Sequence, residues 1–126
     1  MMYRNLNNIE VTWLNKIFET EFIGAEVLWL QILNSSVVYK QKYAFASLKF
    51  HVEECLEKYP FRLRVPVEMR AFQKEAAPVI FLLHVLKGVV DELEIFTADS
   101  SRLNAENINL DKVEHVINKE NLYPID

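Results

Sequence analysis

Two carboxylates in one predicted strand are the first residues here whose type and spacing could support chemistry. Glu92 and Glu94 stand two positions apart in an alternating segment, so both side chains would leave one strand face about 6–7 Å apart. Acid–base carboxylate pairs use such separations. Alternating glutamates on a strand more often solvate a sheet, and nothing nearby in the sequence would desolvate either group and raise its pKa. We therefore expect a solvated pair rather than a catalytic one.

The three histidines do not form a metal-binding pattern. His51 and His84 fall in different predicted strands, and His115 falls in a predicted C-terminal helix. No pair of histidines has the spacing of a metal-ligand motif, and Cys55 has no second cysteine to join it. His84, inside an apolar segment, is expected to be a hydrogen-bonded core histidine rather than a ligand or a base. The sequence predicts no metal and no cofactor.

Serine and cysteine nucleophiles lack an activating context. No serine lies in a G-x-S-x-G segment, and no base is evident beside Cys55. We expect Cys55 to be a partly buried thiol in a reducing compartment. The protein is therefore not expected to be an enzyme. An enzyme would need two or more of His51, His84, Glu92 and Glu94 to converge on one pocket.

Charge and composition limit the classes of partner. The net charge is −4, and basic and aromatic residues are not interleaved, which disfavours direct binding of nucleic acid and fits a basic protein partner better. The N-terminus lacks the apolar core of a signal peptide, and no apolar run has the length of a membrane-spanning helix. We expect a cytoplasmic protein without membrane contact. With 126 residues, two glycines and no repeat or linker, the chain predicts a single α+β domain over residues 1–126.

A hairpin between Pro78 and Asp99 is the element around which the predicted fold is organised. Val79 to Leu86 is apolar on both parities, which is typical of a strand buried on both faces. Gly88 can adopt the positive φ of a tight turn, so the following segment is expected to pair with it antiparallel. We expect one face of this second strand to be exposed to solvent, because its acidic residues alternate with the apolar residues Val89, Leu93 and Ile95.

Two helices are predicted before the sheet and one after it. Asn7, with Glu10 three positions later, indicates a capping box that opens a helix from about Ile9 to Glu21. The segment from Ala25 to Leu33 is apolar on most sides, which predicts a second, more deeply buried helix. Asp111 to Lys119 carries Val113, Val116 and Ile117 at helical spacing and predicts a short third helix.

Three further strands complete the predicted fold. They are expected at Ser36 to Lys40, Ala44 to Glu53 and Phe61 to Phe72, where Pro66 argues for an edge position or a bulge. The fold class is α+β, an antiparallel sheet of about five strands with two N-terminal helices packed on one face and a short C-terminal helix. Sequential pairing favours a meander and leaves the strand order open. The solvent face would carry Lys49, His51, Arg62, Arg64, Glu68, Arg70, Glu92, Glu94 and Phe96.

Four segments of the chain resemble a group of small bacterial proteins, some of which lie in toxin–immunity loci. The segments are RNL at Arg4 to Leu6, FIGAEVLWLQI at Phe22 to Ile32, RVPVE at Arg64 to Glu68 and LHVLKGVVDELEIFTAD at Leu83 to Asp99. The resemblance implies an immunity protein of the contact-dependent inhibition type, which binds and neutralises a cognate toxin such as a nuclease domain. It carries over no site residue.

The mixed charged face has two readings. It usually serves cross-strand pairing and solubility, and it is alternatively a recognition surface. On the second reading, the expected contacts with a cognate toxin are acidic residues near the hairpin and in a second patch: Asp91, Glu92, Glu94, Asp99, Glu53, Glu54 and Glu57. The protein itself would be a monomer or a weak dimer. A rival hypothesis is a structural or regulatory module that self-associates through an edge strand such as Ser36 to Lys40.

Overall fold

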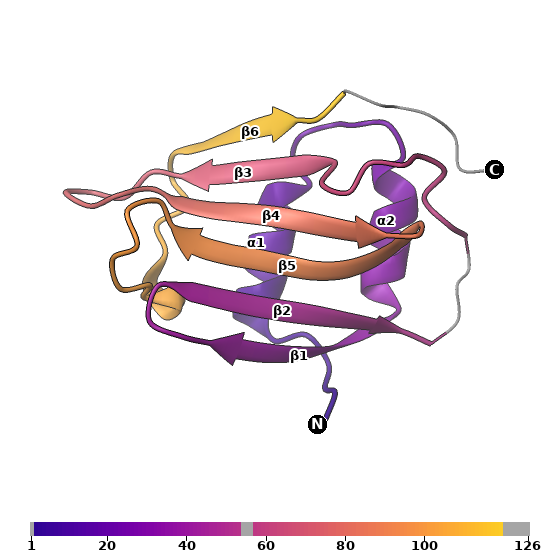
Figure 1. Cartoon of the computed structure of the whole chain (residues 1–126), viewed down its shortest axis with the longest axis horizontal. Helices are drawn as coiled ribbons and strands as arrows, with labels where there is room; N and C mark the ends of the chain where they lie inside the picture. Colours follow the sequence, from indigo (N-terminus) through magenta and orange to yellow (C-terminus); the bar gives the residue numbers. More distant parts are fainter. Residues whose placement is uncertain (1, 54–56, 120–126) are drawn as a thin grey trace.

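The computed structural model of the chain describes residues 2–53 and 57–119, in which two α-helices, a short 3-10 helix and one antiparallel sheet are formed (Figure 1). In chain order the elements are α1 (Asn8–Ile17), α2 (Ala25–Leu33), β1 (Ser35–Gln41), β2 (Phe45–Val52), β3 (Val67–Ala71), β4 (Val79–Leu86), β5 (Val89–Thr97), η1 (Ala105–Asn107) and β6 (Val113–Ile117). Within the described residues the sheet has six strands in the order β1-β2-β5-β4-β3-β6. The α+β class and the helices on one face are as expected. The simple meander is not, because β2 lies beside β5.

The predicted hairpin is present at the centre of the sheet as β4 and β5. Its turn consists of Lys87 and Gly88, which both have positive φ angles, 53° and 81°. Two positive φ angles in a two-residue turn match the right-handed twist of the strands that flank it. A Cβ at Gly88 would lie 3.0 Å from the carbonyl oxygen of Tyr59, so the turn also needs glycine for space. Both the backbone geometry and the packing therefore require a glycine at position 88.

A β-bulge at the start of β5 corrects the parity predicted for that strand. His84 is opposite Glu92, but the next residue, Val85, is opposite Val90, so Asp91 is an extra residue. The bulge reverses the alternation on its N-terminal side. As a result Val90, which is 2% exposed, faces the core in place of Val89.

The core lies between one face of the sheet and the two helices. Trp13 on α1 packs against Phe81 on β4, with ring centroids 6.2 Å apart. Burying one large aliphatic side chain contributes about 1.5–3 kcal/mol, so a continuous layer of them dominates the stability of the fold. The layer consists chiefly of Leu14, Ile17, Leu28, Ile32, Leu48, Leu83, Leu93 and Ile95, all at most 1% exposed.

The two helices begin near the predicted positions, but both differ from expectation. Helix α1 has the predicted capping box between Asn7 and Glu10, and it ends at Ile17 rather than near Glu21. Helix α2 is not more deeply buried, since Leu30 and Leu33 are 51% and 59% exposed. The apolar residues on the different sides of α2 are therefore not all covered by the rest of the protein.

One helix prediction and one strand prediction are wrong in the second half of the chain. The segment predicted as a helix from Asp111 to Lys119 forms β6 instead, and the helical residues before it are the short η1. Two β-branched valines and an isoleucine favour an extended chain once β3 offers an edge to pair with. The strand predicted over Phe61 to Phe72 is confined to β3, which begins directly after Pro66. Strand β3 is not an edge strand, because β6 pairs with its outer side.

The second face of the sheet is not covered by any described helix or strand (Figure 1). On β4, Ile80 is 9% exposed but Leu86 is 50% exposed, so this strand is not fully buried on both faces as predicted. In the described part of the chain, no helix is long and apolar enough to cross a membrane.

Candidate binding surface

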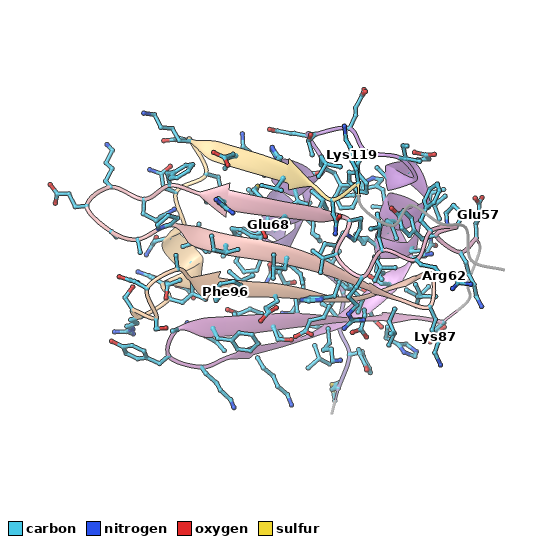
Figure 2. All side chains as sticks on the ribbon, turned by 45° about the horizontal axis from the view of Figure 1, so that its top comes forward. Glu57, Arg62, Glu68, Lys87, Phe96 and Lys119 are labelled. Atoms are coloured by element: carbon cyan, nitrogen blue, oxygen red, sulfur yellow. The ribbon has the colours of Figure 1, made fainter. Side chains whose placement is uncertain are left out.

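The uncovered side of the sheet presents three rows of side chains that cross the strands. Residues opposite each other on antiparallel strands share a face. The register forms the rows Lys40-Ser47-Glu94-Leu82-Glu68-Val116, Val38-Lys49-Glu92-His84 and Phe45-Phe96-Ile80-Arg70-Glu114. We call these residues, together with Asp91 and His51, the open face. Figure 2 labels Glu68 and Phe96 on two of its strands.

Two diagonal hydrogen bonds form a polar cluster in the middle of the open face. The hydroxyl of Ser47 donates to Oε2 of Glu92 at 2.5 Å, and Nε2 of His84 lies 2.9 Å from Oε1 of Glu94. Three neighbouring strands, β2, β5 and β4, supply the four side chains. The prediction that Glu92 and Glu94 lie on the same face of one strand is therefore confirmed. Each carboxylate also has a specific partner, which the sequence alone did not indicate.

The polar cluster lacks the arrangement needed for nucleophilic catalysis. The Ser47 hydroxyl bonds to a carboxylate rather than to the imidazole of His84, so its hydrogen bond does not supply a serine–histidine pair. Nδ1 of His84 is buried and has no hydrogen-bond partner among the described residues. The hollows that stand out on the described surface are lined by other residues. The cluster therefore fixes charges in place, and one of these hollows lies beside it on the open face, where Glu68, Leu82 and Val116 line it.

Charge pairs surround the cluster. Asp91, brought out by the bulge, lies 3.8 Å from Nζ of Lys49 and 3.4 Å from a guanidinium nitrogen of Arg64. On β3, Arg70 pairs with Glu68 at 3.1 Å. These side chains are about one-quarter to one-half exposed, so each pair contributes at most about 1 kcal/mol to stability. Their effect is to hold charges at defined positions.

The open face is mixed rather than strongly acidic. It carries the five carboxylates of Glu68, Asp91, Glu92, Glu94 and Glu114 against the four cations of Lys40, Lys49, Arg70 and the adjacent Arg64, a net charge of −1 with neutral histidines. Apolar side chains lie among them, of which Val116 is 39% exposed, and Leu86, two residues after His84 on β4, is 50% exposed next to the open face. Charged and apolar side chains therefore alternate across the open face.

The other predicted contact residues lie away from the cluster. Asp99 follows the far end of β5, roughly 26 Å along the strand from Asp91. Its carboxylate accepts a hydrogen bond from the Ser101 backbone, and interactions with Ser101 lower the pKa of Asp99. Glu53 and Glu57 are exposed, while Glu54 lies outside the described residues. Figure 2 shows Glu57 near Arg62 and Lys87, at the turn end of the hairpin. The structure therefore does not gather all these acidic residues into one patch.

The three histidines make different contacts. His51 packs against the ring of Tyr3 at 4.9 Å, and His115 points to the helix side, where Nε2 bonds the carbonyl of Lys16 at 2.9 Å. In the described residues, no three His, Cys, Asp or Glu side chains are placed to hold a metal ion. Cys55 lies outside the described residues.

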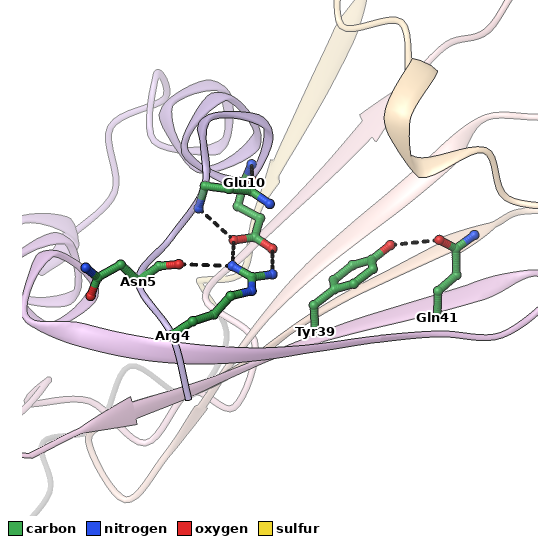
Figure 3. A network of polar contacts seen from close by, with 6 residues as sticks. Arg4, Asn5, Glu10, Tyr39 and Gln41 are labelled. Atoms are coloured by element: carbon green, nitrogen blue, oxygen red, sulfur yellow. Dashed lines mark hydrogen bonds and ion pairs between the residues drawn. The ribbon is translucent and has the colours of Figure 1, made fainter. Parts of the chain in front are cut away.

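An ion pair at the N-terminus was not foreseen from the sequence. Glu10 is 2% exposed, and its carboxylate receives two guanidinium bonds from Arg4, at 2.8 and 2.6 Å, and one from the Asn7 backbone (Figure 3). The hydrogen bond to Glu10 raises the pKa of Arg4. The backbone of Arg4 also exchanges two hydrogen bonds with Val37, which covers the middle of the edge strand β1. In the sequence, the capping residue Glu10 was the only sign of this contact, because its basic partner, Arg4, lies before the helix.

The chain was compared with protein families, curated proteins and solved structures. No family model matches the chain, and neither a curated protein nor a solved structure matches it significantly. The fold is that of an α+β protein in which, among the described residues, helices cover only one face of the sheet. Its function has to be inferred from the surface itself.

Proposed function

We propose that this protein is not an enzyme and that it acts in the cytoplasm as an immunity protein, binding and neutralising a cognate bacterial toxin. The observation that supports this proposal best is the open face. One side of a twisted sheet is left without a covering layer in the described residues, and it displays charged and apolar side chains together. A surface of this kind fits recognition of a protein better than conversion of a small substrate.

The partners of the charged groups favour rigid recognition. Glu92 and Glu94 are hydrogen-bonded to neighbouring strands, and Asp91 is fixed by the bulge and two cations. Side chains that are already ordered lose less conformational entropy when a partner binds. These three residues are the proposed contacts at the hairpin. Asp99, Glu53, Glu54 and Glu57 are the proposed outlying contacts.

Charge acts at two ranges in this proposal. The net charge of −4 attracts a basic partner and speeds association at low salt. A nuclease domain is such a partner, because it must neutralise phosphates where it binds its substrate. At short range, the mixed charges of the open face provide specificity rather than bulk attraction. The inhibitor would bind over the substrate surface of the toxin and need no catalytic group of its own.

The direct test is to mix the purified chain with the product of the neighbouring gene and examine complex formation by gel filtration. We expect a stable complex at low salt that weakens as salt is added. Separate elution of the two proteins at low salt would overturn the proposal. Within the complex, Glu92→Gln combined with Glu94→Gln should slow association, whereas Glu75→Gln in the exposed loop before β4 should not.

Self-association through β1 is the alternative function. In its favour, β1 is an edge strand of the sheet. Against it, Arg4 already occupies the backbone groups of Val37 in the middle of that edge. Light scattering of the purified chain separates the two, since only self-association requires an oligomer that grows with concentration in the absence of a partner.

A further inference from the structure

The helix side of the molecule has an apolar stripe that the core does not use. Ile23, Leu30 and Leu33 are 62%, 51% and 59% exposed, and with Glu26 they follow spacings of three, four and three residues along α2 and the turn before it. The outward face of a surface helix is normally polar. Single exposed apolar residues are common, whereas several on the same side of one helix are more typical of a contact surface.

A hollow between the two helices lies beside this stripe. Its volume is about 420 Å³, and it is lined by Asn15, Phe18, Glu19, Ala25, Glu26 and Trp29. The rings of Phe18 and Trp29 are 5.0 Å apart and form its aromatic part. The hollow therefore combines aromatic surface with carboxylates at the rim.

The charges around the stripe and the hollow are negative on balance. Among the described residues, Glu19, Glu21 and Glu26 lie near two cations: Lys16, which pairs with Glu19 at 3.0 Å, and Lys119, which lines a second hollow together with Glu21 and Ile23. The local net charge is therefore −1, and the carboxylate of Glu26 is the one at the aromatic hollow. Among the described residues, no hydrogen bond or ion pair is made by the side chain of Glu26. An unpaired carboxylate beside an aromatic hollow is suited to a cationic side chain.

We propose that this helix-side surface binds a basic, amphipathic segment of a partner protein. An arginine or lysine of that segment occupies the hollow, against Trp29 and next to Glu26, while apolar residues of the segment pack on Leu30 and Leu33. Charge complementarity selects this partner over a second copy of the chain, whose glutamates would meet those of the first. The inference rests on the proposal that the protein works by binding another protein, and it adds a second docking surface opposite the open face.

The test uses a synthetic peptide as the probe. The peptide forms an amphipathic helix with leucines on one face and arginines on the other, and two reference peptides carry glutamate for arginine or serine for leucine. Isothermal titration measures binding to the full chain. We expect the basic amphipathic peptide to bind and both reference peptides to bind at least tenfold more weakly, because each removes one of the two kinds of contact.

Matched variants locate the binding site. Leu30→Gln combined with Leu33→Gln keeps helix propensity and charge, and it should weaken peptide binding at least tenfold. Leu86→Gln removes an equally exposed leucine from the hairpin and should change binding less than twofold. Glu26→Gln should also weaken binding, whereas Glu75→Gln, with the same charge change, should not. Circular dichroism checks that every variant is folded.

Three results would overturn the inference. They are absence of peptide binding, equal binding by the stripe variants and their controls, and a concentration-dependent oligomer that Leu30→Gln dissociates. The last result would identify the stripe as a contact between copies of the chain. Failure of the proposed function is measured separately, by the complex with the neighbouring gene product and its dependence on Glu92 and Glu94. Either hypothesis can therefore fail without the other.

Discussion

The side-chain oxygen of Gln31 on α2 accepts a hydrogen bond from the backbone N–H of Val90 at 2.8 Å, which joins the helix layer to the bulged start of β5. The amide nitrogen of the same residue donates to the carbonyls of Gly88 and Glu57, at 2.9 and 2.8 Å. Gln31 is 1% exposed, so one buried amide serves the hairpin turn, the bulge and the chain that precedes Tyr59. A buried polar side chain is stable here because its hydrogen bonds are made.

Gln31→Leu should therefore lower the free energy of unfolding by about 2–3 kcal/mol, because the N–H of Val90 would stay buried without an acceptor. Urea denaturation measures the change. Gln41→Leu is the control, since Gln41 is exposed: its amide nitrogen donates to the carbonyl of Leu103, and its side-chain oxygen accepts from the hydroxyl of Tyr39, which water can replace. It should cost less than about 1 kcal/mol. Similar losses in both variants would contradict the role assigned to Gln31.

Arg4→Ala should destabilise the fold by about 2 kcal/mol, because it leaves the carboxylate of Glu10 buried with a backbone donor only. The partial exposure of Arg4, 43%, keeps the expected loss below that of a fully buried pair. Arg64→Ala removes an arginine of similar exposure whose partner, Asp91, is more accessible. Its loss should stay below about 1 kcal/mol. An Arg4→Ala loss no greater than this would show that Glu10 is resolvated.

Tyr59 should make stability fall between about pH 10 and 12. Burial raises the pKa of Tyr59 to about 12 from its ordinary value of 10.0, so the unfolded chain loses this proton first. In this range the folded state binds more protons than the unfolded state, and the free energy of unfolding therefore decreases as pH rises. Tyr59→Phe should make the decrease shallower in urea denaturation at several pH values.

Two features make the tyrosine experiment interpretable. Burial also raises the pKa of Tyr39, so part of the alkaline decrease should remain in Tyr59→Phe. Tyr43 is 69% exposed, and Tyr43→Phe is the control for loss of a phenol at the surface. If Tyr43→Phe and Tyr59→Phe behaved alike, the alkaline loss would not come from the buried phenol.

Gly88→Ala should cost about 2 kcal/mol, since φ is 81° and the added Cβ would lie 3.0 Å from backbone and side-chain atoms of the preceding loop. Lys87→Gly at the adjacent turn position removes a strained non-glycine residue and should leave stability within about 1 kcal/mol of the original. Thermal unfolding of both variants provides the comparison. Equal loss in the two would mean that the turn tolerates either residue.

The polar cluster of the open face should matter more for binding than for folding. Ser47→Ala removes the hydrogen bond to Glu92, whose carboxylate water can then reach, so the stability change should be within about 1 kcal/mol. If the cluster positions contacts, the same variant should weaken the complex with the neighbouring gene product at least fivefold in titration calorimetry. Unchanged affinity would exclude the cluster from the interface.

Local patterns predicted most of the fold. Apolar alternation located β2 and the β4–β5 hairpin, and the pair Asn7 and Glu10 located the start of α1, because these signals depend on neighbouring residues. The bulge at Asp91 could not be predicted, since it depends on how β5 pairs with β4. The same applies to β6, which takes its conformation from the free side of β3.

The surface was predicted in outline only. Alternation placed Glu92 and Glu94 on the solvent face, but their partners, Ser47 and His84, come from other strands and required the register. The stripe on α2 was interpreted as core because composition does not show which apolar residues are covered. Gln31, a polar residue in the middle of that apolar helix, was the signal for a buried contact.

The strand order has a consequence for how the chain folds. Phe45 on β2 is opposite Phe96 on β5, 51 positions later, while the β4–β5 hairpin closes over two residues. Contacts between distant segments lose more chain entropy before they form, and they slow folding. The β1–β2 pair closes over a short turn, so only its docking on β5 is long-range. If this docking follows formation of the β4–β5 hairpin, substitutions between β2 and β5 should chiefly speed unfolding rather than delay refolding.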